Sequence, residues 1–335
     1  KYSNNFVIRE VDSMNNNFNC LRDPVNNNEL IVDGDFIKSS DGKSHPIINN
    51  IPRFVDVENY SADFGAQWNM FPKTQLDSHT KLDVSESRLA RCLQNDLENI
   101  RGKLVLEAGS GAGRFTEILL KYGAIIHSFD FSNAVEANAK NNGHNENLTL
   151  VQADIRKIPF KKSSYDYVVC LGVLQHTPDP DESILALWEM LKPNGALVID
   201  DYAFKWRVYL PPPLGQALDI YRMIILKLPR KSRFKVVKYL VDFWFPIHWK
   251  FKESLLIQRV LRRLSPVIFH YHSLKLTNRQ MYYEWALLDT HDSTTDFYRH
   301  HRTAKQIHQV LDNLNAIDIV VKHGGNGIEA YCKKS

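Results

Sequence analysis

The distribution of apolar and polar positions divides the chain of 335 residues into segments with different periods. Short apolar runs, which are typical of strands, alternate with segments whose apolar residues recur every three or four positions, as in amphipathic helices. Strands are expected over 104–106, 124–129, 148–151, 165–170 and 196–199, with helices over 115–122, 132–141 and 184–191. This alternation predicts a doubly wound α/β fold, in which helices cover both faces of a parallel sheet.

The same rhythm stops after residue 202 and resumes at 303. A helix is expected over 303–313, followed by strands over 317–322 and 328–333. The glycine-rich link between these two strands suits a hairpin, which would give the sheet an antiparallel edge. We therefore expect a mostly parallel sheet of seven strands, built from residues 101–202 and completed by 303–335.

The segments outside this core differ in character. Residues 1–55 alternate short apolar pieces with Asn, Asp and Gly, and predict a small β-rich region with a hairpin at Asp33-Gly34-Asp35. Residues 56–100 have the helical period of a lead-in. Residues 203–302 are basic, aromatic and mostly helical in pattern, and prolines including Pro246 are expected to break their helices. This last segment is predicted to be a helical insertion after the fifth strand.

Composition is that of a soluble globular protein, with 44% hydrophobic and 24% charged residues. No run approaches the length needed to span a bilayer, and the first residues lack the apolar core of a signal peptide. The four cysteines are scattered and form no closely spaced pair: Cys20, Cys92, Cys170 and Cys332. A reducing cytoplasm is the expected setting.

Charge is distributed unevenly along the chain. The net charge is +4, yet residues 203–275 hold 15 Lys/Arg and only 3 Asp/Glu. This excess predicts an anionic partner or surface for the insertion. Four interpretations stay open: a lid over an anionic acceptor, peripheral attachment to an anionic membrane, nucleic-acid binding, or a helical cap whose charges are simply solvated.

A glycine-rich turn follows the first strand of the core. Gly109, Gly111 and Gly113 allow close approach to a ligand and a sharp entry into a helix. Such a turn could hold the pyrophosphate of a dinucleotide, but Arg114 occupies the position of that motif's third glycine. Glu107, just before the loop, would repel a pyrophosphate and suit an ammonium or sulfonium group.

Two acids follow the next strands of the core. Asp130 ends the second strand, 17 residues after Gly113, where a carboxylate can accept hydrogen bonds from ribose hydroxyls. Asp154 follows the third strand, where it could face the exocyclic amine of an adenine. Each acid taken alone could equally be a helix cap, but their order and spacing favour an adenosyl site.

These residues and several motifs carry a resemblance to one superfamily. The motifs are Val105–Phe115, Phe129-Asp130-Phe131-Ser132, Gln152-Ala153-Asp154-Ile155, Ile158-Pro159-Phe160, Tyr165-Asp166-Tyr167, Gly172–Asp179 and Leu191–Gly195. In this order the chain resembles class I S-adenosylmethionine-dependent methyltransferases of the small-molecule type. The flanks resemble a subgroup linked to polysaccharide or secondary-metabolite modification, whose small N-terminal domain often binds zinc through paired cysteines. Only Cys20 stands there in this chain, so no metal is expected.

The resemblance implies a Rossmann-like methyltransferase fold with S-adenosylmethionine as the cofactor. It places the methionine part at Glu107 and the glycines, the ribose at Asp130, and the adenine at Asp154 and Ile155. The full set of residues expected at the donor is Glu107, Gly109, Ser110, Gly111, Gly113, Arg114, Asp130, Phe131, Asp154, Ile155, Leu171, Gly172 and Gln175.

The acceptor is less readable. Methylation of a hydroxyl requires a base, and His176, just after the fourth strand, is the first candidate, with a structural histidine as its rival interpretation. Asp201 ends the fifth strand, and the polar run 291–302 brings Tyr298 and His300 as further candidates, although that run could be a solvated linker. We expect methylation of a small or saccharide-like acceptor at oxygen. The alternatives are nitrogen or carbon methylation, including an RNA acceptor, and a silent donor-binding scaffold; a nucleic-acid partner is the less favoured.

Overall fold

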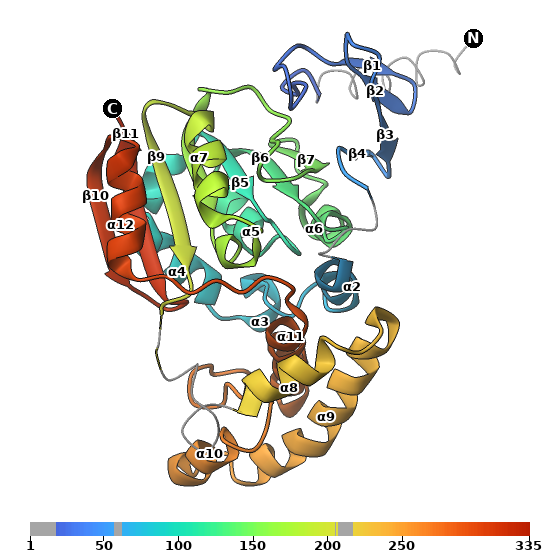
Figure 1. Cartoon of the computed structure of the whole chain (residues 1–335), viewed down its shortest axis with the longest axis vertical. Coiled ribbons are helices and arrows are strands. Elements are labelled where there is room, and N and C mark those ends of the chain that lie inside the picture. Colours follow the sequence, from blue (N-terminus) through green and yellow to red (C-terminus); the bar gives the residue numbers. More distant parts are fainter. Residues whose placement is uncertain (1–17, 57–61, 205, 207–216) are drawn as a thin grey trace.

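The computed structural model describes residues 18–56, 62–204, 206 and 217–335. Within these ranges the chain forms a seven-stranded sheet, a four-stranded sheet and a group of helices in the insertion. Figure 1 shows the small sheet at one end of the molecule and the inserted helices at the other. In these ranges no helix combines the length and apolar character that crossing a membrane requires.

The large sheet confirms the predicted fold class. Its strands lie in the order β10-β11-β9-β8-β5-β6-β7, and β11 pairs antiparallel with both β9 and β10 while the others run parallel. Their bounds are β5 Leu104–Ala108, β6 Ile125–Asp130, β7 Leu148–Gln152, β8 Tyr165–Cys170, β9 Leu191–Asp201, β10 Ala316–His323 and β11 Ile328–Lys334. The last two strands follow the insertion, so the inserted helices interrupt a single sheet.

Apolar side chains on the two faces of this sheet form two separate cores. Leu106 and Val168 pack on the face covered by α7 and α12, whereas Val105 and Val169 pack on the face covered by α4 and α5. Both faces are buried because helices cross between parallel strands on either side. The helices of the core are α4 Val84–Cys92, α5 Arg114–Lys121, α6 Val135–Asn142, η2 Leu174–His176, α7 Pro180–Met190 and α12 Ala304–Asn313.

The N-terminal region is attached to the outer strand β7. Its strands are β1 Ile31–Asp33, β2 Phe36–Lys38, β3 Ser44–Ile48 and β4 Ile51–Pro52, and the predicted hairpin joins the first two. Arg53 Nη1 donates to Gln152 Oε1 at 3.1 Å, and Leu21 pairs with Phe160. The small sheet therefore packs beside the core at the edge away from the insertion.

The inserted helices form a cap, defined here as residues 217–295. It contains α8 Ala217–Ile225, α9 Arg230–Lys250, α10 Leu255–Leu261 and α11 Arg279–Thr295 around a core of its own. The lead-in elements α2 Ala62–Met70, α3 Asp77–Thr80 and η1 Leu97–Ile100 precede β5, and α2 contacts α11. The chain leaves and re-enters the core side by side, because Ala203 pairs with Arg302.

Pro246 does not break its helix, contrary to the sequence prediction. It lies within α9, which continues to Lys250. The flanking side chains of Val241, Phe245 and His248 are buried in the cap, while Pro246 faces outward. Packing on both sides of the proline therefore outweighs the one lost backbone hydrogen bond.

Candidate active site

The glycine loop, residues 109–113, joins β5 to α5 at the carboxyl end of the sheet. Gly109 has a φ of +75°, and a Cβ there would lie 2.2 Å from Val173 Cγ2. Only a glycine allows both this conformation and this approach. The amides of Gly109 and Ser110 donate to the carbonyl of Phe129 at 2.8 and 3.1 Å. The loop is thus fixed to the end of β6.

Asp130 ties the same loop to the strand end. Its Oδ2 accepts from the amide of Gly111 at 2.9 Å, and its Oδ1 accepts from the amide and hydroxyl of Ser132 at 2.8 and 2.7 Å. Burial raises the pKa of Asp130, and these hydrogen bonds oppose that rise. Its carboxylate therefore shapes the loop and also borders a pocket.

That small pocket encloses about 610 Å³, part of it open to solvent. It is lined by Gly109, Phe129, Asp130, Phe131, Ala153, Asp154, Ile155, Gly172, Val173, His176 and Thr177. The walls are mostly apolar, with carboxylates on two strand ends. Asp154 is itself held by Arg156, whose backbone amide, Nε and Nη2 donate to it at 2.9, 3.1 and 2.7 Å. Apolar walls with polar groups at the edge suit a nucleoside.

Glu107 lies behind the glycine loop. It is 2% exposed, and its Oε2 accepts from Thr116 Oγ1 at 2.5 Å and from Ser128 Oγ at 2.8 Å. Burial raises the pKa of Glu107 to about 7, despite these two hydrogen bonds. The carboxyl group thus joins β5, α5 and β6 beneath the predicted methionine site. Gly113 also lies behind the loop, where a Cβ would lie 2.2 Å from Asn138 Oδ1.

A larger cleft of about 1890 Å³, partly open to solvent, begins where the small pocket ends. Gly109 and Gly172 line both spaces, and Leu171 lines the cleft. Ser110 Oγ and Gln175 Oε1 are buried beside it and have no hydrogen-bond partner among the described residues. Buried polar atoms of this kind are expected to meet a ligand or water. The close backbone approach and these two atoms fit the polar end of S-adenosylmethionine.

Arg114 brings positive charge to the cleft. Its Nε donates to Ser85 Oγ at 3.1 Å and its Nη1 donates to Gln75 Oε1 at 2.6 Å. Within the described ranges no carboxylate lies at ion-pair distance from it. Burial and the neighbouring charge of Arg88 lower the pKa of Arg114 to about 10, so it is still cationic at neutral pH. It can therefore hold a carboxylate near the glycine loop.

Two other arginines of the cleft are already paired. Arg88 contacts the fully buried Asp200, whose Oδ1 accepts from the amide of Gly172 at 2.6 Å. Arg91 makes a bidentate pair with Glu329, with Nε and Nη2 at 2.9 and 2.7 Å from its oxygens. These ion pairs stabilise the walls of the cleft. Of the three arginines, Arg114 alone has no carboxylate at ion-pair distance among the described residues.

The cap supplies the opposite wall. His270 Nε2 lies 2.6 Å from Asp289 Oδ2, and Ser273 Oγ lies 3.2 Å from His270 Nδ1. Trp285 Nε1 donates to Asp289 Oδ2 at 3.2 Å, and Gln75 Nε2 donates to Asp289 Oδ1 at 3.1 Å. Gln75 Oε1 also accepts a hydrogen bond from Arg114. One hydrogen-bond network therefore connects His270 of the cap to Arg114, directly after the glycine loop.

Asp292 is a second acid on α11, the helix that carries Asp289. Burial, together with the charges of Asp296 and Asp289, raises the pKa of Asp292 to about 8. This acid borders the cleft and is mostly protonated at neutral pH. It can therefore donate a hydrogen bond to an acceptor molecule.

Three of the predicted catalytic residues, His176, Tyr298 and His300, lie together beside the small pocket. His176 lines that pocket, and its Nδ1 lies 3.2 Å from the carbonyl of Tyr298; burial lowers the pKa of His176. His300 Nε2 lies 3.0 Å from the carbonyl of Thr177, and its ring stacks with that of Tyr298. The returning segment 296–302 is thus attached to η2 and lies as an irregular segment beside the small pocket.

Asp201 is 1% exposed at the end of β9. Its Oδ1 accepts from the amide of Tyr202 at 2.7 Å, and its Oδ2 lies 4.0 Å from Arg302 Nη1. Burial raises the pKa of Asp201 to about 7. The catalytic roles of Asp201, His176, Tyr298 and His300 stay predictions.

Trp285 and Asp289, which line the large cleft from the cap, were not singled out from the sequence, and Asp292 was included only within the polar run 291–302. Trp285, Asp289 and Asp292 follow one another at helical spacing on α11, and Asp296 comes directly after the helix. A line of acids on a helix that is otherwise largely buried was the available signal, because buried carboxylates require partners or a function.

The parallel sheet, the fixed glycine loop and the acids at successive strand ends define the class as Rossmann-like nucleoside-binding enzymes of the class I methyltransferase type. Residues 106–199 match the family model described as "Methyltransferase domain". This match identifies that part of the chain as a methyltransferase domain, with S-adenosylmethionine as the methyl donor of its class.

The chain spans about half the length of the curated relatives it matches. Ubiquinone biosynthesis O-methyltransferase of Coxiella burnetii (strain RSA 493 / Nine Mile phase I) is 31% identical over 118 residues, which are 35% of this chain and 50% of the relative. The protein of the same name from Shewanella sp. (strain ANA-3) is 33% identical over 100 residues, covering 29% and 42%.

Among solved structures, a putative S-adenosylmethionine-dependent methyltransferase from Methanococcus maripaludis is 15% identical, with a TM-score of 0.45 over 84% of this chain and 96% of the other. Human N-acetylserotonin methyltransferase in complex with its donor is 14% identical, with a TM-score of 0.46 over 84% and 60%.

Proposed function

We propose that this protein transfers the methyl group of S-adenosylmethionine to a hydroxyl group of a small, saccharide-like acceptor in the large cleft. The main support for this proposal is that the small pocket and the large cleft meet at Gly109 and Gly172, so a donor in one would adjoin an acceptor in the other. When bound, the donor supplies a methyl group that is already activated on a sulfonium. The chain's own residues then have to align the two molecules and exclude water.

In this proposal the glycine-loop side holds the donor. Asp130 and Asp154 face the ribose and adenine from the small pocket. Ser110 and Gln175 offer their unpartnered oxygens to the polar end, and Arg114 pairs with its carboxylate. Glu107 supports the loop from behind.

His270 is proposed to take the proton of the acceptor hydroxyl. With Asp289 accepting from Nε2, the lone pair of His270 lies on Nδ1, and the carboxylate stabilises the imidazolium that forms. Ser273 Oγ, 3.2 Å from Nδ1, marks a position where a hydroxyl can hydrogen-bond to this nitrogen. His176 is the second candidate, because it borders the small pocket.

The lining of the cleft supports a hydroxyl-bearing acceptor. Gln67, Asp289 and Asp292 offer hydrogen-bonding groups, and Trp68 and Trp285 offer flat apolar surfaces. Saccharides suit such a combination of polar edges and aromatic faces. Methylation at oxygen is also supported by the names of the matched relatives, which are O-methyltransferases.

Calorimetry and a methyl-transfer assay test the proposal. We expect S-adenosylmethionine binding that Asp130→Ala weakens, and turnover with hydroxylated small molecules. His270→Ala is expected to lower kcat by about 10²–10⁴-fold while donor affinity stays unchanged. Absence of donor binding would refute the donor site. Binding without turnover over a broad acceptor panel would favour a silent scaffold, and preferential methylation of RNA would favour the nucleic-acid alternative.

A further inference from the structure

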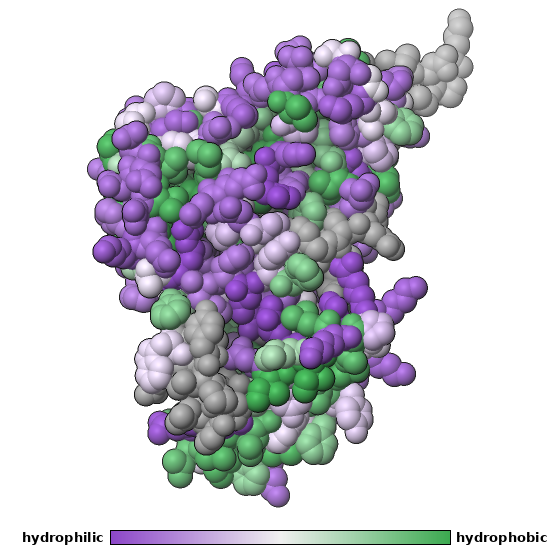
Figure 2. Space-filling view, viewed as in Figure 1, coloured by the Kyte–Doolittle hydropathy of each residue, from purple (hydrophilic) through white to green (hydrophobic). Residues whose placement is uncertain are grey.

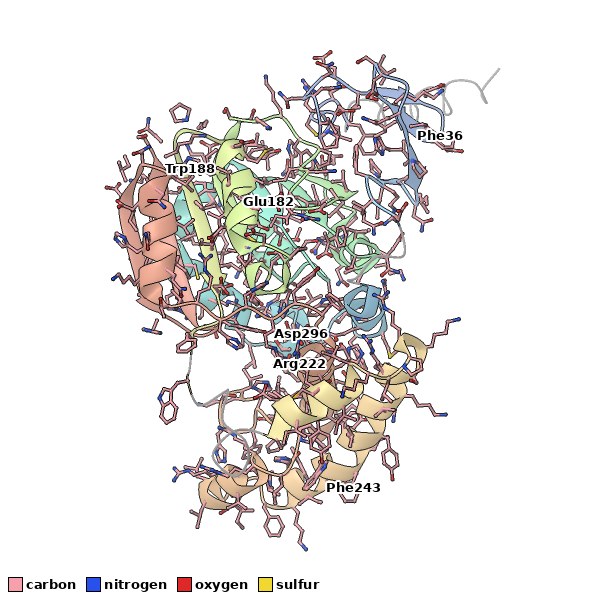
Figure 3. The ribbon with its side chains drawn as sticks, in the orientation of Figure 1. Phe36, Glu182, Trp188, Arg222, Phe243 and Asp296 are labelled. Carbon is pink, nitrogen blue, oxygen red and sulfur yellow. The ribbon has the colours of Figure 1, made fainter. Side chains whose placement is uncertain are left out.

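The cap exposes an unusual amount of apolar surface. Of the 22 large hydrophobic residues that are exposed in the described chain, ten lie between residues 217 and 264. Eight of these ten lie on three helices, for example Met223 and Ile224 of α8, Tyr239 and Phe243 of α9, and Leu255 and Leu256 of α10. Figure 2 shows hydrophobic side chains gathered over these helices, and Figure 3 shows Phe243 at the outer side of the cap.

The exposed apolar residues of α10 do not result from loose packing of this helix against the cap. His248 Nδ1 lies 2.7 Å from Gln258 Oε1, and Gln258 Nε2 donates to the carbonyls of His248 and Phe251 at 2.9 and 3.1 Å. Gln258 and Leu261 are buried and fix α10 to the rest of the cap. The leucines on its other face are therefore held outward by a packed helix.

Basic side chains accompany these apolar residues. Leu255 and Leu256 are 65% and 70% exposed, and Arg259, Arg262 and Arg263 are exposed on the same helix or just after it. In the described part of the chain these three arginines make no ion pair. An interface with aliphatic side chains and free cations side by side matches a bilayer surface, where the chains enter the acyl boundary and the cations meet anionic headgroups.

Other occupants fit less well. A nucleic acid would be bound through cations and stacked aromatic side chains. It has no apolar phase into which the outward-facing leucines could insert. A second copy would bring the same excess of positive charge to the interface, at a cost in repulsion. We propose that the cap attaches peripherally to an anionic membrane surface through α10 and the exposed residues of α8 and α9.

The placement agrees with the proposed function without depending on it. Residues 265–274 lead from α10 to His270 and Ser273 in the wall of the large cleft. Attachment at α10 would therefore hold the acceptor side of the cleft close to the lipid surface.

Co-sedimentation of the full chain with lipid vesicles tests the proposal. We expect binding to vesicles of phosphatidylcholine mixed with phosphatidylglycerol, and weaker binding to phosphatidylcholine alone. The double substitution Leu255→Ser and Leu256→Ser should lower partitioning by about tenfold or more. The matched control is Val25→Ser with Ile31→Ser, two side chains that are each 69% exposed at the other end of the molecule.

The control variant should bind vesicles like the original protein. Arg262→Gln with Arg263→Gln should weaken binding to the anionic vesicles and reduce its dependence on salt. Equal partitioning of the leucine variant and the original protein would overturn the proposal. So would a concentration-dependent dimer that the leucine variant abolishes without vesicle binding, or binding to RNA alone. S-adenosylmethionine binding, measured on the same samples, separates this outcome from failure of the proposed activity.

Discussion

Replacement of Asp296 by Asn tests how the cap is held to the core. Asp296 follows α11 and is fully buried. Its carboxylate accepts from Arg222 Nε of α8 at 2.6 Å and from Arg299 Nε at 2.7 Å, and lies 3.6 Å from His176 Nδ1. Figure 3 shows Arg222 and Asp296 between the cap and the sheet. One charge therefore joins the cap, the returning segment and η2.

The size of the effect follows from what the substitution leaves behind. Asn keeps the volume of Asp but leaves the Arg222 and Arg299 side chains, 19% and 10% exposed, without their shared negative charge. Breaking a buried pair in this way costs about 3–5 kcal/mol. Arg299 keeps a second partner, Asp219, at 3.3 Å, which favours the lower end of that range. We expect a loss of about 3 kcal/mol in the free energy of unfolding.

Urea unfolding followed by tryptophan fluorescence measures this loss, and Trp244, Trp249 and Trp285 report on the cap. Asp318→Asn is the control, because Asp318 pairs with Lys333 at 2.9 Å on the surface and its side chain is 58% exposed. Screening by water makes that exposed pair weak. An Asp296→Asn loss no larger than that of the control would refute the argument.

Gly109→Ala should weaken S-adenosylmethionine binding at least tenfold in calorimetry, since the methyl group would meet Val173; Gly102→Ala, with a φ of +68° and nothing within 4 Å of its Cβ, is the control. Unchanged affinity in the first variant would contradict this account of the loop. Glu107 has its pKa raised from 4.5 to about 7, so the folded state binds more protons and its contribution to stability falls by about 3 kcal/mol as pH rises through that interval. In urea titrations between pH 4.5 and pH 7, Glu107→Gln should remove this part of the decline in the free energy of unfolding. If the free energy of unfolding changed with pH equally in both proteins, the raised pKa of Glu107 would be refuted.

Much of the core follows from local sequence. The apolar runs and helical periods predicted all seven strands of the large sheet, because a parallel sheet covered on both faces makes its strands short and apolar. Gly109 was also identified from the sequence, because a sharp turn that approaches a ligand closely requires glycine. The structure gives it a positive φ and leaves no room for a Cβ beside Val173. The antiparallel edge at β10 and β11 was also predicted, since the glycine-rich link between these strands is a local feature, whereas the order of the strands comes from the structure.

Tertiary structure alone decided which groups face the large cleft. Gln75 and Asp289 are 214 positions apart, yet they meet across the boundary of lead-in and cap, and no local pattern encodes such a contact. Likewise, the sequence placed Glu107 at the donor from its position, and that role stays a prediction; only the fold shows that its Oε2 accepts from Thr116 and Ser128 while its Oε1 has no partner among the described residues. Periodicity reports which side of an element is apolar, but the direction of a polar side chain depends on what packs against it. For that reason the sequence determined the glycine loop and the sheet that carries it, whereas the packing of the cap determined which polar side chains face this loop across the large cleft.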